Sequence, residues 1–300
     1  MRVFALLLAL SPLTALAQPA APQQSNEELI RKARHLTELM KEGEKKQPAA
    51  PKQHVLTPPE ELFKNRGKAT LLYALPINKP PAYRDYLRFV MDEGLFKEAV
   101  DTVNALAALP RDMTVFFADC GKPNAFYNPA NGNITFCFEL VQLFDQLYSQ
   151  SAKSPEEAKE LIRGAVFFVF FHEFGHALAH ELQLPITGKE EDAVDQFATV
   201  LLLEQGERGE QAVLAGAAFF LALGSQPNKQ LVFWDEHSLD TQRFYNIACW
   251  LYGASPFHQV NLVAKGLLPA ARAARCGDEF QQLRRSWKTI ADPKLKRPLK

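Results

Sequence analysis

Residues 161–176 constrain the fold of this chain more than any other part of the sequence. Residues 161–171 read LIRGAVFFVFF, and the pentapeptide HEFGH at 172–176 follows at once. Such an apolar run predicts a helix that is buried in a protein core. A helix that carries His172, Glu173 and His176 into the interior needs an anchor of this kind. We therefore expect a buried helix over residues 156–182 with polar side chains near its C-terminal end.

The pentapeptide matches the HExxH signature, in which a helix supplies two zinc ligands and a general base. His172 and His176 are four residues apart, so on a helix both imidazoles lie on one face and can bind one ion. Glu173 lies beside that face, where it can take a proton from a zinc-activated water. Gly175 has no side chain, which lets a strand or a substrate approach closely. The alternative is a buried helix with two ordinary core histidines.

His180 continues the four-residue spacing, but it cannot share an ion with His172. The two residues are eight positions apart, which corresponds to a rise of about 12 Å along a helix. A metzincin site would need glycine and histidine where the chain has Ala179 and Leu182, and no methionine follows Met113 to form a Met-turn. That class is excluded, and we interpret His180 as a residue of the core or of a pocket edge.

A second predicted helix, residues 190–204, offers carboxylates for the third ligand position. Glu191 and Asp195 are four residues apart and share a helix face. Glu191 could bind the metal while Asp195 accepts a hydrogen bond from the outer nitrogen of a ligand histidine. Glu190 and Asp192 remain alternatives for the ligand role, because acidic residues are favoured in the first turn of any helix.

Two longer segments resemble a known family. HEFGHALAHELQLPITGKEEDAVDQFA and WDEHSLDTQRFYNIACWLYG are similar to the gluzincin metallopeptidases, in which HExxH is followed by a helix carrying ExxxD, and especially to a secreted group of such proteins. The resemblance covers about residues 70–277. It implies an α+β, mostly α fold with a small sheet or hairpin beside the HExxH helix. It also implies one catalytic Zn²⁺ and a peptide or protein substrate.

Three stretches are more distantly similar to the CAAX-prenyl-protease and heat-shock-protease family. These are residues 124–126 (Asn-Ala-Phe), the Glu191 to Asp195 helix, and His237 with Arg243, where Ser238 replaces the proline of HPxxxxR. That departure puts the family's substrate class in doubt. The resemblance implies that His237 lies near the substrate oxyanion and that Arg243 braces a carboxylate of the site. The full set implied is His172, His176 and Glu191 as zinc ligands, Glu173 as base, and Asp195 beside a ligand histidine.

The N-terminal segment and the cysteines predict an exported protein. Residues 1–17 have a basic start, an apolar core and an Ala-Leu-Ala end, which is typical of a signal peptide and too short for a membrane span. We therefore expect a periplasmic or secreted protein. Its four cysteines favour disulfides, and we expect Cys120 to pair with Cys137 and Cys249 with Cys276. The alternative is four buried thiols.

The rest of the chain divides into a tether, a domain and a tail. Residues 18–59 are polar and proline-containing, with a helical pattern only at 27–46; 60–290 form the metallopeptidase-like domain; and 291–300 form a basic, solvated tail. A hairpin with strands at 114–118 and 134–138 is expected around the Asn131-Gly132 turn, and 124–138 is a candidate for binding peptide by strand addition, unless it is an ordinary structural hairpin. Other helices are predicted at 83–94, 96–109, 139–148, 211–223 and 239–251.

These patterns together predict a zinc-dependent peptidase. The chain has 34 basic and 34 acidic residues and no basic stripe, so we expect no nucleic-acid partner, and no stable membrane span is expected. The alternative from another class is a zinc-stabilised binding or chaperone-like exported protein with little proteolysis. Glu173 distinguishes the two hypotheses, because a structural zinc site does not need it.

Overall fold

The computed structural model of the protein describes residues 67–75, 79–150, 152–226 and 231–300. The predicted signal segment 1–17 and the predicted tether 18–59, with its helical pattern at 27–46, lie outside the described residues. Within the described residues the fold is mostly helical with one small sheet, as the sequence predicts.

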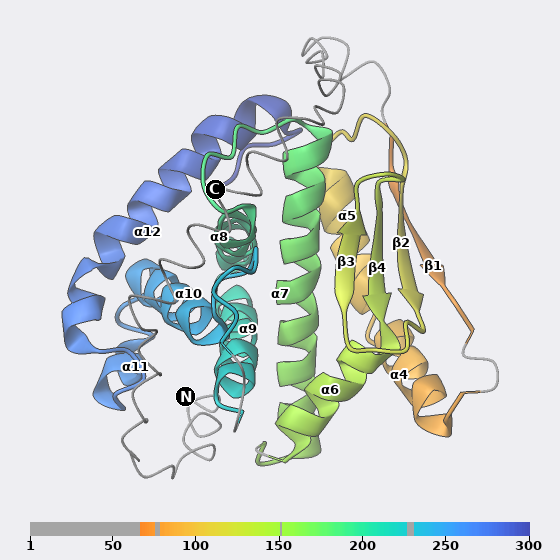
Figure 1. Ribbon diagram of the computed structural model, residues 1–300, viewed down its shortest axis with the longest axis horizontal. Helices are drawn as coiled ribbons and strands as arrows, with labels where there is room; N and C mark the ends of the chain where they lie inside the picture. The colour runs from red at the N-terminus through yellow and green to blue at the C-terminus, as the bar shows by residue number, and fades with distance from the viewer. Residues whose placement is uncertain (1–66, 76–78, 151, 227–230) are drawn as a thin grey trace, which may run out of the picture. The chain divides into compact units, whose positions relative to one another are not determined.

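The sheet has four strands in the order β1-β2-β4-β3. They are β1 (Ala69–Tyr73), β2 (Met113–Ala118), β3 (Ala125–Asn128) and β4 (Asn133–Cys137). β1 and β4 both pair with β2 in parallel, and β3 pairs with β4 in antiparallel register. β3 is therefore an edge strand, and it lies beside the long helix of the molecule (Figure 1).

The predicted hairpin is wrong in its strands, although its turn is present. The hairpin joins β3 to β4 through the turn that contains Gly132, whose φ of 74° favours glycine. The segments predicted as its two arms, β2 and β4, are neighbours but run in parallel. The short strand β3 lies between β2 and β4 in the sequence and runs antiparallel to β4. β4 has the more apolar alternation, with Ile134 and Phe136 buried, so it takes the central place and β3 the edge.

Three helices connect and cover the sheet: α4 (Pro81–Asp92), α5 (Leu95–Leu106) and α6 (Phe138–Ser149). α5 packs on the sheet through Phe96. The ring of Phe96 lies 5.2 Å from that of Phe117 on β2 and 5.1 Å from that of Phe136 on β4. It also lies 6.2 Å from Phe170 of the next helix. This aromatic cluster joins the sheet to that helix.

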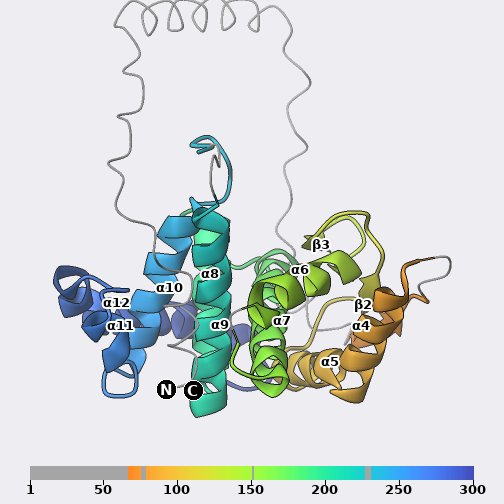
Figure 2. The ribbon, with the colours of Figure 1, turned by 90° about the horizontal axis from the view of Figure 1, so that it is seen from below.

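Helix α7 (Pro155–Glu181) stands between the sheet and the remaining helices in both perpendicular views (Figures 1 and 2). Ser154 caps its start by accepting a hydrogen bond from the backbone N–H of Glu157. Among the described residues, α7 alone is long and apolar enough to cross a membrane, but 89% of its apolar window is buried inside the protein. The helix therefore has the burial of a core helix, which agrees with its predicted role.

The other side of α7 is covered by α8 (Glu190–Leu203) and α9 (Glu207–Gly224), and α10 (Asp240–Ala254) packs on these two helices (Figure 2). They are followed by α11 (Val260–Ala264), α12 (Ala270–Ala291) and a short 3₁₀ helix, η1 (Asp292–Lys294). The helices predicted from α4 to α10 are confirmed to within a few residues. α12 was not predicted, although residues such as Phe280, Leu283 and Trp287 recur at helical spacing on its buried face.

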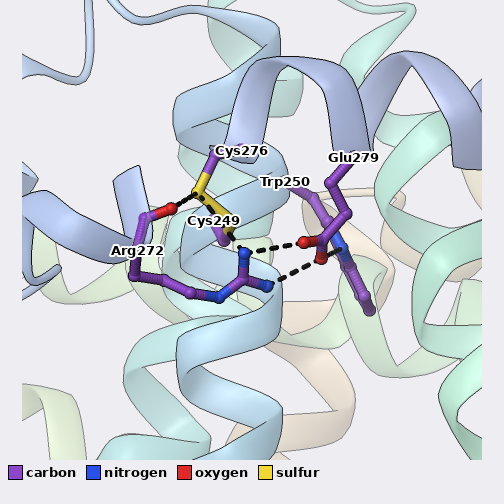
Figure 3. The surroundings of a disulfide bond; sticks show 5 residues. All are labelled: Cys249, Trp250, Arg272, Cys276 and Glu279. Carbon is purple, nitrogen blue, oxygen red and sulfur yellow. Dashed lines mark hydrogen bonds and ion pairs between the residues drawn. A yellow bond between two sulfur atoms is a disulfide. The ribbon is translucent and has the colours of Figure 1, made fainter. Parts of the chain in front are cut away.

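Both predicted disulfide pairs are confirmed. Cys120 and Cys137 are joined with their Cα atoms 5.5 Å apart, and Cys249 and Cys276 with theirs 5.1 Å apart. The second bond ties α12 to α10, and the ion pair of Arg272 with Glu279 lies beside it (Figure 3). Two disulfides indicate folding in an oxidising environment of the kind that exported proteins meet.

The C-terminal residues pack on the domain, which corrects the prediction of a solvated tail. Leu299 is fully buried, and Leu295 forms an isolated β-bridge with Ala107. Arg297 pairs with Glu204 at the end of α8 at 2.9 Å. Leu295 and Leu299 lie four residues apart in this basic tail. They bury apolar surface, while the charged side chains of the tail reach partners on the domain.

Candidate metal centre

Two histidines of α7 and one glutamate of α8 bring their side chains together. The Nε2 atom of His172 lies 3.2 Å from Oε2 of Glu191. The Nε2 atom of His176 lies 3.3 Å from Oε1 of the same carboxylate. Glu191 stands in the first turn of α8, opposite the buried end of α7. We call His172, His176 and Glu191 the candidate metal centre.

The outer nitrogens of the two histidines are held by carboxylates. Nδ1 of His172 is 2.7 Å from Oδ1 of Asp195, and Nδ1 of His176 is 2.7 Å from Oε1 of Glu190. Because an ionised carboxylate only accepts hydrogen bonds, each Nδ1 donates. In the neutral rings, both Nε2 lone pairs therefore face Glu191, which is the orientation that metal-binding histidines have.

The donor set fits a zinc ion. Oε2 of Glu191 is buried and has no hydrogen-bond partner, although two imidazole nitrogens approach it. Tetrahedral zinc with bonds of about 2.0–2.1 Å places neighbouring ligand atoms about 3.3 Å apart. The spacing of 3.2 Å from Oε2 of Glu191 to His172 and the spacing of 3.3 Å from its Oε1 to His176 are each close to that edge. Two imidazoles and one carboxylate are also the ligand types of catalytic zinc sites.

The charges around the centre favour a cation. Burial opposes a charge on His176, but Glu191 and Glu190 outweigh it and raise the pKa of His176 to about 9. Burial likewise opposes the charge on Glu191, yet His172 and His176 hold the pKa of Glu191 well below its ordinary value. Without a metal, His176 thus carries a proton at neutral pH, and the raised pKa of His172 favours a proton there as well, which offsets the charge of the carboxylates. A metal ion at the centre replaces those protons.

A buried ion pair between Asp195 and Arg243 supports His172 at its outer nitrogen. Asp195 accepts two hydrogen bonds of 2.7 Å from the guanidinium of Arg243 on α10. The same guanidinium lies over the ring of Phe220, 3.8 Å from its centroid. Burial would raise the pKa of Asp195, but Arg243 and His172 lower it to about 2. Asp195 therefore stays ionised and holds the His172 ring in place.

Glu173 points toward the edge strand of the sheet. Its Oε2 accepts a hydrogen bond of 2.9 Å from the backbone N–H of Tyr127 on β3. The side chain is buried, and burial raises the pKa of Glu173, although His172 and His176 act in the opposite direction. A buried carboxylate with a raised pKa beside two histidines has the properties of a general base.

His237 approaches the centre from the loop before α10. Its Nε2 lies 3.1 Å from Oε2 of Glu191, and its Nδ1 lies 2.9 Å from Oδ1 of Asp235. Glu191 raises the pKa of His237. Lys189 donates to the backbone carbonyls of Asp235 at 3.2 Å and His237 at 3.4 Å, which ties this loop to the start of α8. Within 4.8 Å, His237 groups with Glu191 and Glu236 rather than with the α7 histidines.

His180 lies away from the candidate metal centre at the exposed end of α7. Its Nδ1 is 2.9 Å from the hydroxyl of Tyr127. That hydroxyl donates to Glu181 at 2.6 Å, and Arg111 pairs with the same carboxylate. This cluster joins the hairpin to the end of α7. His180 also lines a pocket edge, where the sequence predicts it.

Gly175 is the point at which α7 and α8 approach each other. A Cβ atom at Gly175 would lie 2.8 Å from Cβ of Val194 and 3.2 Å from Cδ1 of Phe197, both on α8. The close neighbour is therefore a helix, and not the strand or substrate that the sequence suggested. The missing side chain lets Glu191 and Asp195 reach the two histidines.

An open cleft runs past the centre in two arms that share Asn124, Ala125, His172, Glu173 and His237. The α9 arm, of about 440 Å³, is walled mainly by apolar side chains, which include Phe168, Val169, Phe219, Phe220, Leu223 and Leu231. The α8 arm, of about 850 Å³, carries more charge, and its lining includes Tyr127, His180, Lys189, Glu190, Glu236 and Ile186. A bound peptide that occupied both arms would pass directly over Glu173.

Comparison with known proteins agrees with this chemistry. A family model described as "Putative metallopeptidase" matches residues 78–291. The chain belongs to this family. The match contains the candidate metal centre, Glu173, the His237 loop and Arg243, and so supports a metal-dependent enzyme. No curated protein sequence and no solved structure matches the chain.

The sequence did not predict the roles of some residues around the centre of this metallopeptidase-family protein. Asp235, which holds His237, and Lys189, which holds the loop, lie within the two segments that carry the resemblance, but neither belongs to HExxH, ExxxD or the HPxxxxR-like element. Glu190 was weighed only as a ligand, yet it contacts the outer nitrogen of His176. Residues 211–223 are predicted from the sequence only as a helix. The buried Phe219 and Phe220 of this helix are core residues, but they also wall the α9 arm.

Proposed function

We propose that the protein is a zinc-dependent peptidase that cleaves peptide bonds with water. His172, His176 and Glu191 would hold the ion, and Glu173 would act as general base. The observation that carries this proposal is the convergence of two Nε2 atoms on one carboxylate, with each Nδ1 held by another carboxylate. A bound zinc ion supplies a Lewis acid that polarises the scissile carbonyl and lowers the pKa of water.

Glu173 is placed to move a proton between water and the leaving amine. The backbone N–H of Tyr127 holds one of its carboxylate oxygens at 2.9 Å, and the other remains available. Because burial raises its pKa, Glu173 binds a proton more readily than an exposed glutamate does. It can therefore accept the proton of the attacking water and donate it to the amine as the C–N bond breaks.

His237 is the donor that we assign to the developing oxyanion. Asp235 accepts from its Nδ1, and Glu191 raises the pKa of His237, which favours a proton on Nε2 as well. A donor aimed into the cleft stabilises negative charge in the transition state more than it stabilises the neutral carbonyl. Arg243 would act indirectly by keeping Asp195, and through it His172, in position.

The edge strand β3 is where we expect the substrate main chain to bind. Cys137 donates its backbone N–H to the carbonyl of Asn124, so the alternate residues Ala125 and Tyr127 turn their backbone groups away from β4. The N–H of Tyr127 is used by Glu173. Ala125 lines both arms of the cleft, and its backbone groups can pair with an extended peptide.

Zinc content and the variant Glu173→Gln test the proposal. Purified protein should contain about one zinc per chain by mass spectrometry, and His176→Ala should lose it. Glu173→Gln should keep zinc and lose peptide hydrolysis, since glutamine cannot accept the proton. Glu191→Gln should weaken zinc binding more than Glu190→Gln. Zinc retention without hydrolysis in the wild-type protein would favour the alternative, an exported zinc-stabilised binding protein.

A further inference from the structure

We propose that the α9 arm is a specificity pocket that receives one large apolar side chain of the substrate, such as phenylalanine or leucine, next to the scissile bond. This inference rests on the proposed function and adds the substrate class to it. The arm is lined by His172 of the candidate metal centre and by Glu173, and it shares Asn124 and Ala125 with the α8 arm. A side chain in the arm therefore belongs to a residue close to the bond that Glu173 would help to cleave.

The walls of the arm select for apolar groups. Phe168 and Val169 of α7 line the arm together with Phe219, Phe220 and Leu223 of α9, and Leu231 of the loop before α10 completes the apolar lining. A volume of about 440 Å³ lies at the small end of the range of about 300–1,000 Å³ for ligand pockets. It accommodates one large side chain.

The charged groups that border the arm have other partners. Arg243 forms two hydrogen bonds with Asp195, and Asp235 binds the ring and backbone of His237. Asp240, at the start of α10, is engaged as well. Apart from Glu173 and His237, which the proposed reaction uses, a charged substrate side chain would lose its hydration in this arm and meet only charged groups that already have partners, which disfavours its entry.

The position of the edge strand explains how a peptide would reach the arm. A peptide paired with the outer edge of β3 at Ala125 is extended, so its side chains alternate between opposite directions. One side chain can enter the α9 arm while the main chain stays beside Glu173. The α8 arm differs because it carries Lys189, Glu190 and Glu236, so the two sides of the scissile bond meet different chemistry.

Peptide binding to the zinc-loaded Glu173→Gln variant tests the pocket without requiring hydrolysis. Two peptides of equal length that differ only in one phenylalanine or alanine beside the central bond are titrated by calorimetry. Burial of a phenylalanine side chain should make the first peptide bind roughly 10- to 100-fold more tightly. A peptide with aspartate at that position should bind no better than the alanine peptide.

A variant in which a larger side chain fills the α9 arm provides the matched comparison. Leu223→Trp, in the Glu173→Gln background, should reduce the phenylalanine advantage to about threefold or less, since the indole occupies the arm. Leu221→Trp is the control, because Leu221 lies on the same helix, is also partly buried and does not line the arm. Leu231→Asp is a second variant that does not disturb the core, since Leu231 is 54% exposed. It should remove the advantage by placing a charge in the apolar lining.

The outcomes separate the pocket from the proposed activity. Equal affinity for the phenylalanine and alanine peptides, no binding of either, or an advantage that survives both Leu223→Trp and Leu231→Asp would overturn the pocket. Cleavage of both peptides by the wild-type, zinc-loaded protein is assayed in parallel. Selective binding without cleavage would leave the pocket standing and overturn peptidase activity. Cleavage with no preference between the two peptides would leave peptidase activity standing and overturn the pocket.

Discussion

The substitution Gly175→Ala tests whether the approach of α7 to α8 sets the metal centre. The added Cβ atom would lie 2.8 Å from Cβ and 2.9 Å from Cγ1 of Val194, and 3.2 Å from Cδ1 of Phe197. Non-bonded carbon atoms prefer separations of about 3.5–4.0 Å. α8 must therefore move away by roughly 0.7 Å at its closest point. Glu191 and Asp195 lie on the same stretch of α8 and would move with it.

The effect on folding stability should be smaller than the effect on metal binding. Overpacking in a core costs about 1–3 kcal/mol, whereas alanine in place of glycine inside a helix contributes about 1 kcal/mol. The net loss of unfolding free energy is then about 0–2 kcal/mol. Ligand distances in metal sites vary by only about 0.2 Å. A displacement of Glu191 several times larger should weaken zinc binding by about 10- to 100-fold.

Two measurements on one variant separate these effects. Zinc affinity is measured by competition with a chelator, and stability by urea unfolding of the metal-free protein. Gly277→Ala on α12 is the control, because a Cβ atom there meets nothing within 4 Å. It should leave zinc affinity unchanged and stabilise the chain by up to about 1 kcal/mol. Unchanged zinc affinity in Gly175→Ala would refute the reasoning that helix contact at this glycine positions the ligands.

Three further predictions concern the support of the centre. Arg243→Met leaves Asp195 buried without its counter-ion and should lower the unfolding free energy by about 3–5 kcal/mol in urea titrations; a loss below about 1 kcal/mol would contradict this role. Replacing Cys249 and Cys276 by serine opens a link across 27 residues and should cost about 3.5 kcal/mol on the chain-entropy model, measured in the same way. The raised pKa of His176, about 9 in the metal-free chain, means that zinc must displace a proton. Apparent zinc affinity should therefore rise with pH and level off above about 9, and a pH-independent chelator competition would contradict this. The same shift gives the metal-free chain a stabilising contribution that is complete below about pH 6.5 and is lost as pH rises through about 9.

Sequence patterns predicted the helices better than the sheet. Helices such as α7 and α8 carry their signal locally, in a spacing of apolar residues and in capping or acidic first turns. Strand pairing depends on residues far apart in the chain. Residues 114–118 and 134–138 were both recognised as strands, but nothing local shows whether they run parallel. That depends on β3, a strand of four residues whose partly exposed side chains give a weak alternation.

The candidate centre shows the same division between local and distant information. His172, Glu173 and His176 come from one helical turn, and Glu191 with Asp195 from another, so spacing alone identifies them. The contacts that connect these turns come from elsewhere. Glu190 and Glu191 are adjacent in sequence and equally acidic, and only the packing of α8 on Gly175 turns Glu191 toward both Nε2 atoms and Glu190 toward an outer nitrogen.

The gathering of several carboxylates at one place links metal binding to the fold. Glu190 and Glu191 stand in the first turn of α8, where the helix dipole favours negative charge but the side chains repel one another. Of the two basic side chains near the centre, Arg243 is occupied by Asp195, and Lys189 donates to backbone carbonyls of the His237 loop. The remaining balance comes from the proton on His176 or from a metal ion that displaces it. Because the ion binds only where α7 and α8 are packed together, its binding free energy stabilises that packing. The start of α8 should therefore be the part of the centre that loosens first when metal is removed.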